Sequence, residues 1–153
     1  MIGWLLDTNV LSELIRSGCD ANVGKWAREQ PEDRLFMSVL SLAEYEQGIA
    51  KLPPAAPARA RLTELMNATE SRFSGRVLGL SDAAVRRWGQ IGGTMWRLTG
   101  QPPEVVDTLL AATAVEHDLY LVTRNVRDVR NSGAAVFNPW SDDPAGFPLR
   151  RPR

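Results

Sequence analysis

Short apolar runs alternate with amphipathic helical stretches along this chain, and this alternation restricts the available folds more than any other feature. The apolar runs that predict strands are residues 2–6, 34–37, 76–80, 119–123 and 134–137. Helical periodicity occupies residues 11–16, 20–29, 39–51, 58–73, 82–98 and 105–117. Strands joined through helices pair in parallel, so we expect a three-layer α/β/α sandwich with a mainly parallel central sheet.

The composition is typical of one globular domain with a single core. The chain has 153 residues, of which 44% are hydrophobic and 24% charged. We place the domain at residues 1–141 and expect a poorly ordered tail at residues 142–153, which are rich in Pro, Arg and Asp. The formal net charge is zero, so no overall field attracts a polyanion. With no apparent signal peptide or membrane-length apolar run, we expect a cytoplasmic protein that has no membrane partner.

The first predicted strand runs directly into an acidic residue. Asp7 follows residues 2–6, and Thr8 and Asn9 are cap-type residues that open the next helix. Asp7 is therefore expected at the carboxyl end of a strand, the edge at which open α/β sheets bind ligands. A helix N-cap or an ordinary surface acid remains the alternative for a single carboxylate, so further acids at the same edge decide between these interpretations.

Further acidic residues occupy the starts of later helical segments. Glu44 has apolar neighbours on its helix, and an acid on the buried side of a helix needs a partner. Asp107 lies in the first turn of its helix, where it would otherwise serve the helix dipole. Asn125 and Asp128 follow the strand that ends at residue 123, and turn formation is their alternative role. Segments that follow parallel strands gather at one sheet edge, so we expect these side chains to converge.

Converging carboxylates favour a divalent cation. They repel one another and raise one another's pKa unless a cation neutralises them. Hard oxygen ligands suit Mg²⁺, with Mn²⁺ as the alternative, and such ions can activate water against a phosphodiester. Other chemistries lack their signatures, because the chain has one cysteine, Cys19, one histidine, His117, and no Gly-rich phosphate loop or nucleophile elbow.

With these residues in view, the chain resembles PIN-domain ribonucleases of the VapC toxin type, close to the FitB-like branch. The matching segments are residues 5–13, 38–44, 107–114, 121–125 and 136–140. The resemblance implies an α/β/α sandwich and divalent-metal-dependent endoribonuclease activity on RNA. It also implies a homodimer, inhibition by a cognate VapB-like antitoxin in a hetero-oligomer, and a cytoplasmic bacterial or archaeal setting.

The resemblance also implies roles for individual residues. The expected metal ligands and catalytic acids are Asp7, Glu44 and Asp107. The family's fourth acid often follows a Thr-Arg pair, where this chain has Asn125, and Asp128 is the candidate replacement. The residues expected to orient the carboxylates, with capping and turn formation as their alternative, are Thr8, Asn9, Ser38 and Thr123. Arg124 is expected to contact RNA phosphates.

Two other functions stay open at this point. The departure at Asn125 favours a PIN scaffold without strong catalysis, acting as an RNA- or protein-binding module. A haloacid-dehalogenase-like phosphatase is disfavoured because Asn9 stands where its second Asp would lie. For a toxin we expect loop or single-stranded RNA as substrate, because its bases are accessible, and a helical antitoxin segment that masks the cleft. The apolar candidates for that contact, of which two or three should be exposed, are Val10, Leu11, Leu14, Ile15, Leu42, Tyr45 and Ile49.

Overall fold

The computed structural model describes residues 1–150 and contains a five-stranded parallel sheet covered by helices. The strands are β1 (Gly3–Leu6), β2 (Leu35–Ser38), β3 (Val77–Leu78), β4 (Leu119–Val122) and β5 (Val136–Phe137). Their order in the sheet is β3-β2-β1-β4-β5, and every neighbouring pair is parallel. The predicted three-layer parallel architecture is therefore confirmed.

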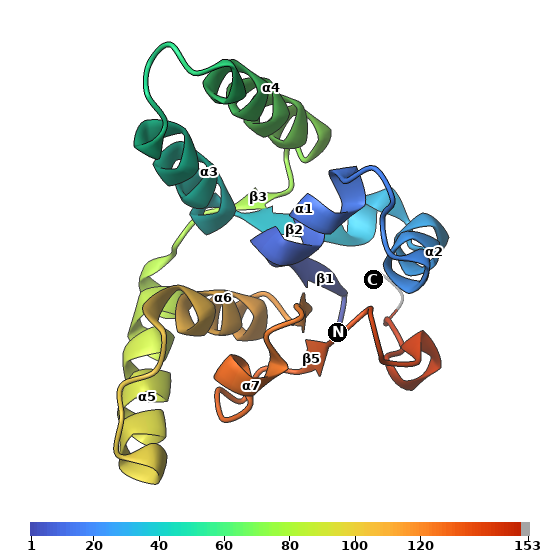
Figure 1. The fold of residues 1–153 in the computed structure, drawn as a ribbon. Helices are drawn as coiled ribbons and strands as arrows, with labels where there is room; N and C mark the ends of the chain where they lie inside the picture. The colour runs from blue at the N-terminus through green and yellow to red at the C-terminus, as the bar shows by residue number, and fades with distance from the viewer. Residues whose placement is uncertain (151–153) are drawn as a thin grey trace.

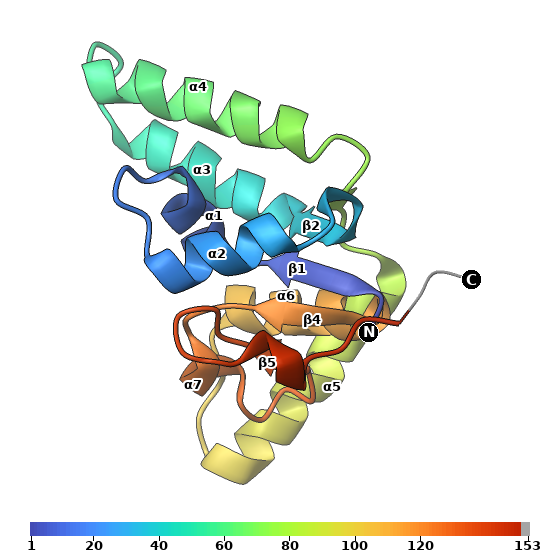
Figure 2. The same cartoon turned by 90° about the vertical axis from the view of Figure 1, so that its right-hand side faces the viewer.

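The helices form two pairs at opposite ends of the molecule and a central group around the sheet. They are α1 (Thr8–Ile15), α2 (Ala21–Glu29), α3 (Val39–Lys51), α4 (Pro57–Arg72), α5 (Asp82–Thr99), α6 (Val105–Glu116) and α7 (Val126–Val129). Figures 1 and 2 show α3 packed on α4 at one end and α5 packed on α6 at the other. Among residues 1–150, no helix combines the length and apolar character required to cross a membrane.

The alternating side chains of β1 divide the core between the two faces of the sheet. Trp4 and Leu6 pack with α1 and α2 on one face, whereas Leu5 packs with α6 on the other. All four residues of β1 are buried, as expected for a central strand covered on both sides. Trp4 centres an aromatic group, with its ring centroid 5.3 Å from that of Trp26 and 5.1 Å from that of Phe137. The middle strand is thereby held rigidly between two layers.

The chain leaves β1 toward one face of the sheet and leaves β4 toward the other. Val10 of α1 belongs to the core cluster of Trp4, whereas Val129 of α7 belongs to the cluster on the opposite face. The neighbouring carboxyl ends of β1 and β4 therefore form a topological switch point, the place where open α/β sheets bind ligands. Asp7 and Thr123 are the residues that directly follow these two strands.

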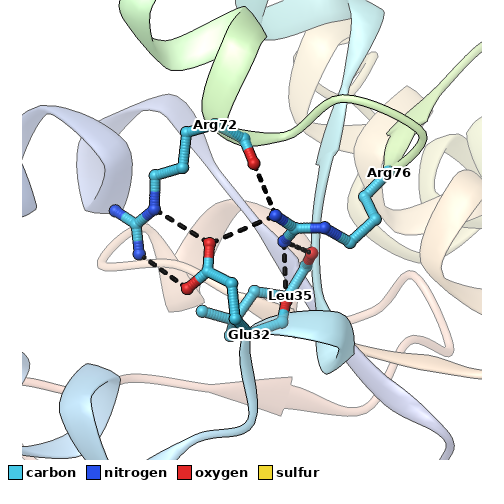
Figure 3. A network of polar contacts seen from close by, with 4 residues as sticks. All are labelled: Glu32, Leu35, Arg72 and Arg76. Atoms are coloured by element: carbon cyan, nitrogen blue, oxygen red, sulfur yellow. Dashed lines mark hydrogen bonds and ion pairs between the residues drawn. The ribbon is translucent and has the colours of Figure 1, made fainter.

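An ionic clamp fastens the far end of α4 to the sheet (Figure 3). The Glu32 carboxylate accepts hydrogen bonds from Arg72 Nε and Nη2, each at 3.0 Å, and from Arg76 Nη2 at 3.2 Å. Arg76 Nη1 also donates to the Leu35 carbonyl at 2.7 Å, beside the start of β2. Both guanidinium groups lie over the buried ring of Phe73. The clamp therefore holds the C-terminal end of α4 next to the start of β2.

The described part of the predicted tail, residues 142–150, packs back against the domain. The Phe147 ring lies 4.8 Å from that of Phe137, and the Arg150 amide donates to the carbonyl of the first residue at 2.8 Å. This differs from the expectation of a poorly ordered segment from residue 142 onward. The polar composition suggested a tail, whereas Phe147 and Leu149 pack against the core cluster of Trp4, and Arg150 forms an ion pair with Asp118 at 2.9 Å. Residues 151–153 of the predicted tail lie outside the described residues.

Candidate active site

Asp7 is buried at the carboxyl end of β1, and both of its carboxylate oxygens are held. It is the N-cap of α1, where Oδ1 accepts a hydrogen bond from the Thr8 amide at 2.6 Å. Oδ2 accepts from Thr123 Oγ1 at 2.7 Å and from Asn9 Nδ2 at 2.9 Å. Thr123 follows β4, so its hydrogen bond spans the switch point. A carboxylate that is only 6% exposed is thus fixed in one orientation.

Burial of Asp7 raises the pKa of its carboxyl group above the usual range for aspartate. Hydrogen bonds from Thr123, Thr8 and Asn9 stabilise the carboxylate and oppose that shift, whereas the negative charge of Glu44 adds to it. The net direction is upward, so the site destabilises the negative charge of Asp7 when no cation is present. A cation placed here would relieve that cost.

Asp107 lies in the first turn of α6, and the pKa of its carboxyl group is raised. Burial is the largest cause that raises the pKa of Asp107, which reaches about 6. The remaining causes are negative charges, and in order of size they come from Asp7, Asp128, Glu104 and Glu44. The charges of these acids therefore act on Asp107, although α6 follows α5 and not a strand. In residues 1–150, none of Asp7, Glu44 and Asp107 forms an ion pair with a basic side chain.

The residues predicted to orient the carboxylates divide into two groups. Asn9 and Thr123 bond to Asp7 through their side chains, as described above. Thr8 instead donates from Oγ1 to Ser41 Oγ at 2.8 Å, which joins the start of α1 to the helix that carries Glu44. Ser38 is the N-cap of α3 and accepts from the amide two residues later at 3.1 Å, which is the alternative that the sequence left open.

Two residues are candidates for the fourth ligand position, and their surroundings differ. Asn125 is exposed and precedes α7, and its amide donates to Thr123 Oγ1 at 3.0 Å, while its side chain makes no capping bond. Asp128 is also exposed, but its charge acts on Asp107. Of the two candidates, Asp128 is the one that carries a negative charge, and that charge acts on Asp107. We call the edge of the sheet that carries Asp7, Glu44, Asp107 and Asp128 the acidic edge.

Arg124 lies beside this edge and is turned toward the side of α2 and the C-terminal segment. Its amide faces Asn9 Oδ1 at 3.4 Å, and its guanidinium carbon lies 5.2 Å from the ring centroid of Trp140. The charge of Arg124 also contributes to lowering the pKa of Glu13 on α1. The sequence predicted that Arg124 lies near the site and contacts RNA, but it did not predict that its side chain contacts Trp140 within the protein.

Three residues of this region have roles that the sequence reasoning missed. Ser41 is buried one helical turn before Glu44, and a polar residue on the buried side of a helix was the available signal. Glu104 precedes α6 and adds a further negative charge next to Asp107. Trp140 stacks on Arg124, and its place in the closing segment of residues 136–140 gave no indication of that contact.

The donor set fits a divalent cation in charge and in ligand type. Asp7, Glu44 and Asp107 supply carboxylate oxygens, which are the ligands that Mg²⁺ and Mn²⁺ prefer. Burial, and after it the negative charges of neighbouring acids, raise the pKa of Asp107, and a bound cation would offset both effects. Within residues 1–150, no three acidic, histidine or cysteine side chains are close enough to form a preassembled metal site. Ligation would therefore require these carboxylates to draw together, as repelling groups do when a cation binds.

Comparison with known proteins identifies a protein family and relatives to which the chain is similar. Residues 4–131 match the family model of the PIN domain. The chain is 30% identical over 138 residues to Toxin FitB of Neisseria gonorrhoeae, and the matched residues cover 90% of this chain and 99% of FitB. It is 32% identical over 140 residues to VapC ribonuclease Y4jK of Sinorhizobium fredii, across 89% of this chain and 96% of the relative.

Solved structures give the same result. A chain in the structure of FitAB bound to a DNA fragment superposes with a TM-score of 0.79 at 27% identity, covering 92% of this chain and 97% of its own length. A chain of FitAcB from Neisseria gonorrhoeae superposes with a TM-score of 0.76 at 29% identity, covering 90% of this chain and 98% of its own. The match extends over nearly the whole of each chain, and Asp7, Glu44 and Asp107 lie within the residues that match the PIN-domain family model.

Proposed function

Because the chain belongs to the PIN-domain family, we propose that it is a divalent-metal-dependent endoribonuclease and the toxin of a type II toxin–antitoxin pair. Relatives named as a toxin and as a VapC ribonuclease support both halves of this proposal. The observation that carries it is the Asp7 carboxylate, which is buried and fixed by Asn9 and Thr123. Its negative charge adds to the effect of burial in raising the pKa of Asp107.

The proposed cation is Mg²⁺, with Mn²⁺ as the alternative, held by Asp7, Glu44 and Asp107. Such an ion, when bound, makes water a better nucleophile and offsets charge on the phosphodiester. Asn9 and Thr123 keep Asp7 in one orientation, which limits the reorganisation needed for binding. The pKa of Asp107 is about 6 in the metal-free protein, so its carboxyl group is increasingly protonated as the pH falls through 6. Metal binding should therefore release a proton at such pH values and should weaken as the pH falls.

Binding without cleavage is the second candidate function, and Asn125 favours it. An amide at this position contributes an oxygen but no charge, which would weaken a second metal. The charge that Asp128 exerts on Asp107 argues for catalysis, because it restores an acid to the same edge. The two candidates differ in one respect, since a scaffold would bind RNA and leave it intact.

For the substrate we propose single-stranded or loop RNA in the cytoplasm. The acidic edge is open enough that Asp128 and Asn125 are exposed, so an unpaired strand can reach it. Unstacked bases of loops are also the part of RNA that proteins recognise most readily. Arg124 supplies a positive charge beside the acids and is the first candidate for a phosphate contact.

We further propose that an antitoxin segment masks the cleft by docking beside α1. Of the seven apolar candidates, Ile15 alone is exposed, where two or three exposed residues were expected. Leu14 and Leu42 are half-buried, and the remaining four belong to the buried core, namely Val10, Leu11, Tyr45 and Ile49. A groove lined by Leu14 and Ile15 of α1 and by Leu65 and Ala68 of α4 runs along this helix. Since α1 begins at Asp7, an apolar helix in the groove could aim a basic residue at the acids. A toxin homodimer within a hetero-oligomer is the assembly that we expect.

The experiment that tests the function is incubation of purified protein with total RNA, with and without Mg²⁺, followed by sequencing of the new ends. We expect discrete cleavage sites that require the metal and that are absent with Asp7→Asn. Asp33→Asn, which changes an exposed acid far from the site, is the matched control and should cleave normally. RNA that stays intact with the unchanged protein at every metal concentration would refute the nuclease and favour the binding module.

A further inference from the structure

We propose that Trp140 is a positioning residue that holds the Arg124 guanidinium in place for a phosphate of the RNA strand, on the α2 side of the acidic edge. This inference rests on the proposed ribonuclease function and adds to it the path of the substrate strand. It arises from the contacts of two side chains that lie sixteen positions apart in the sequence and meet beyond β5.

The backbone of Arg124 is anchored to the residues that fix the catalytic acid. Thr123, its neighbour, donates to Asp7 Oδ2 at 2.7 Å. Asn9, which also bonds to that oxygen, faces the Arg124 amide through Oδ1 at 3.4 Å. These two connections set the position of the Arg124 backbone relative to Asp7. A substrate atom bound by Arg124 would therefore lie at a fixed place relative to the acidic edge.

The Arg124 guanidinium stacks on an aromatic ring instead of pairing with an acid. Its central carbon lies 5.2 Å from the centroid of Trp140, and it forms no ion pair within residues 1–150. The acid on the neighbouring helix, Glu13, is engaged elsewhere, since Oε1 accepts from Arg16 at 2.7 Å and from the Asp20 amide at 2.7 Å. The positive charge of Arg124 is thus available to a ligand.

Trp140 is itself held firmly, which is what a platform requires. Its amide donates to Asn138 Oδ1 at 3.1 Å, and its carbonyl accepts from Asn22 Nδ2 of α2 at 3.1 Å. The ring also packs against the core cluster that contains Trp4. The backbone of Trp140 is therefore tied to the turn after β5 and to α2, and its side chain is held by packing against the core.

A stacked arginine costs less to order than a free one when it binds a phosphate. Stacking on the Trp140 ring orients the guanidinium before RNA binds, and it leaves the planar N–H fork free to bind two phosphate oxygens. Because the stack lies on the α2 side, the RNA strand is expected to cross the first turn of α1 from the acids toward α2 and the C-terminal segment. Trp140 acts on the substrate through Arg124.

The test measures binding of a short, fluorescein-labelled, single-stranded RNA to the full chain carrying Asp107→Asn, which prevents cleavage. Trp140→Leu should raise the dissociation constant about three- to fivefold. Trp140→Phe, which retains an aromatic face, should recover most of that loss. Arg124→Ala should weaken binding more and reduce the salt dependence by about one phosphate contact. Arg124→Lys keeps the charge without the planar stack and should resemble Trp140→Leu.

The decisive variant combines Arg124→Ala with Trp140→Leu and should bind like Arg124→Ala alone. An additional loss in the double variant would mean that the indole contacts RNA independently, which overturns the positioning role. Wild-type-like binding by Trp140→Leu or by Arg124→Lys overturns it as well. Since Arg124 is exposed, Arg124→Lys gives an answer even if Trp140→Leu unfolds. Absence of RNA binding by the unsubstituted chain would instead refute the ribonuclease proposal on which this inference rests.

Discussion

At the scale of single residues, the acidic edge stores unfavourable charge in the metal-free protein. Asp7 is buried and Asp107 has a pKa raised to about 6, and other carboxylates add to both shifts. The sequence placed these acids at the starts of segments that follow parallel strands. Asp7 does follow β1, whereas Glu44 lies within α3, and Asp107 lies in the first turn of α6, which follows α5 and leads into β4. The sequence did not predict that Asn9 and Thr123 would share one oxygen of Asp7, since that contact joins residues 116 positions apart.

The raised pKa of Asp107 predicts how stability depends on pH. A pKa above the unfolded value means that the folded state binds the proton more tightly, so the contribution is complete below about pH 4 and is lost as the pH rises through about 6. Asp107→Asn should therefore raise the free energy of unfolding at pH 7 by about 1 kcal/mol without metal, after allowance for solvent screening. Urea denaturation in EDTA at pH 4 and pH 7 measures this, and equal effects at both pH values would contradict it.

The fourth position gives a second prediction at this scale. Asp128→Ala should weaken Mg²⁺ binding several-fold, because its charge acts on Asp107, whereas Asn125→Ala should change it little. Asn125→Asp should strengthen Mg²⁺ binding if its side chain turns toward the acids. Calorimetric titration of each variant decides, and unchanged affinity in Asp128→Ala and Asn125→Asp would assign both residues to turn formation.

At the scale of elements, most boundaries could be predicted from local signals. The helix at residues 39–51 begins after Ser38 and ends before two prolines, as the cap and the breakers indicated. The strand expected at residues 76–80 is shorter, Val77–Leu78, because it lies at the sheet edge and pairs only with β2. The clamp at Glu32 could not be predicted, since it depends on how α4 returns to the sheet.

The clamp predicts a pH-dependent contribution to stability. Hydrogen bonds and charge from Arg72, and then from Arg76, hold the pKa of Glu32 below its usual range. Its contribution is therefore present above about pH 4.5 and is lost as the pH falls through the folded pKa. Glu32→Gln should lower the free energy of unfolding by about 0.5–1 kcal/mol at pH 7, and less in acid. Glu64→Gln, an exposed acid on α4, is the control, and an equal loss in both variants would deny the clamp a specific role.

At the scale of the whole molecule, the parallel sheet explains why residues that are distant in the sequence lie at one edge. Every strand pair is parallel, so segments that follow β1, β2 and β4 open at the same edge. This could be predicted from alternation alone. The sequence could not predict which apolar residues remain exposed beside the site. A helical pattern identifies the apolar face of a helix, but it does not identify which other element covers that face.

The exposed part of that apolar face predicts the effect of a charge on antitoxin binding. Ile15 is 43% exposed and Leu14 is half-buried in the groove between α1 and α4. Ile15→Glu should weaken binding of the cognate antitoxin at least tenfold while RNA cleavage persists, because the change lies at the far end of α1 from Asp7. Surface-bound toxin titrated with antitoxin gives the affinity, with Val85→Glu, an exposed residue on α5, as the control. Undiminished affinity of Ile15→Glu would exclude this groove as the docking surface.

The most direct test of the central claim is the rate of RNA cleavage as a function of Mg²⁺ concentration for the unchanged chain, Asp7→Asn, Asp107→Asn and Asp33→Asn. The account predicts a metal-dependent rate that Asp33→Asn retains and that the two site variants lose by at least a hundredfold, while thermal melts show that both remain folded. A rate that is independent of Mg²⁺, or that survives Asp7→Asn, would contradict the assignment of this edge as a metal-dependent nuclease site.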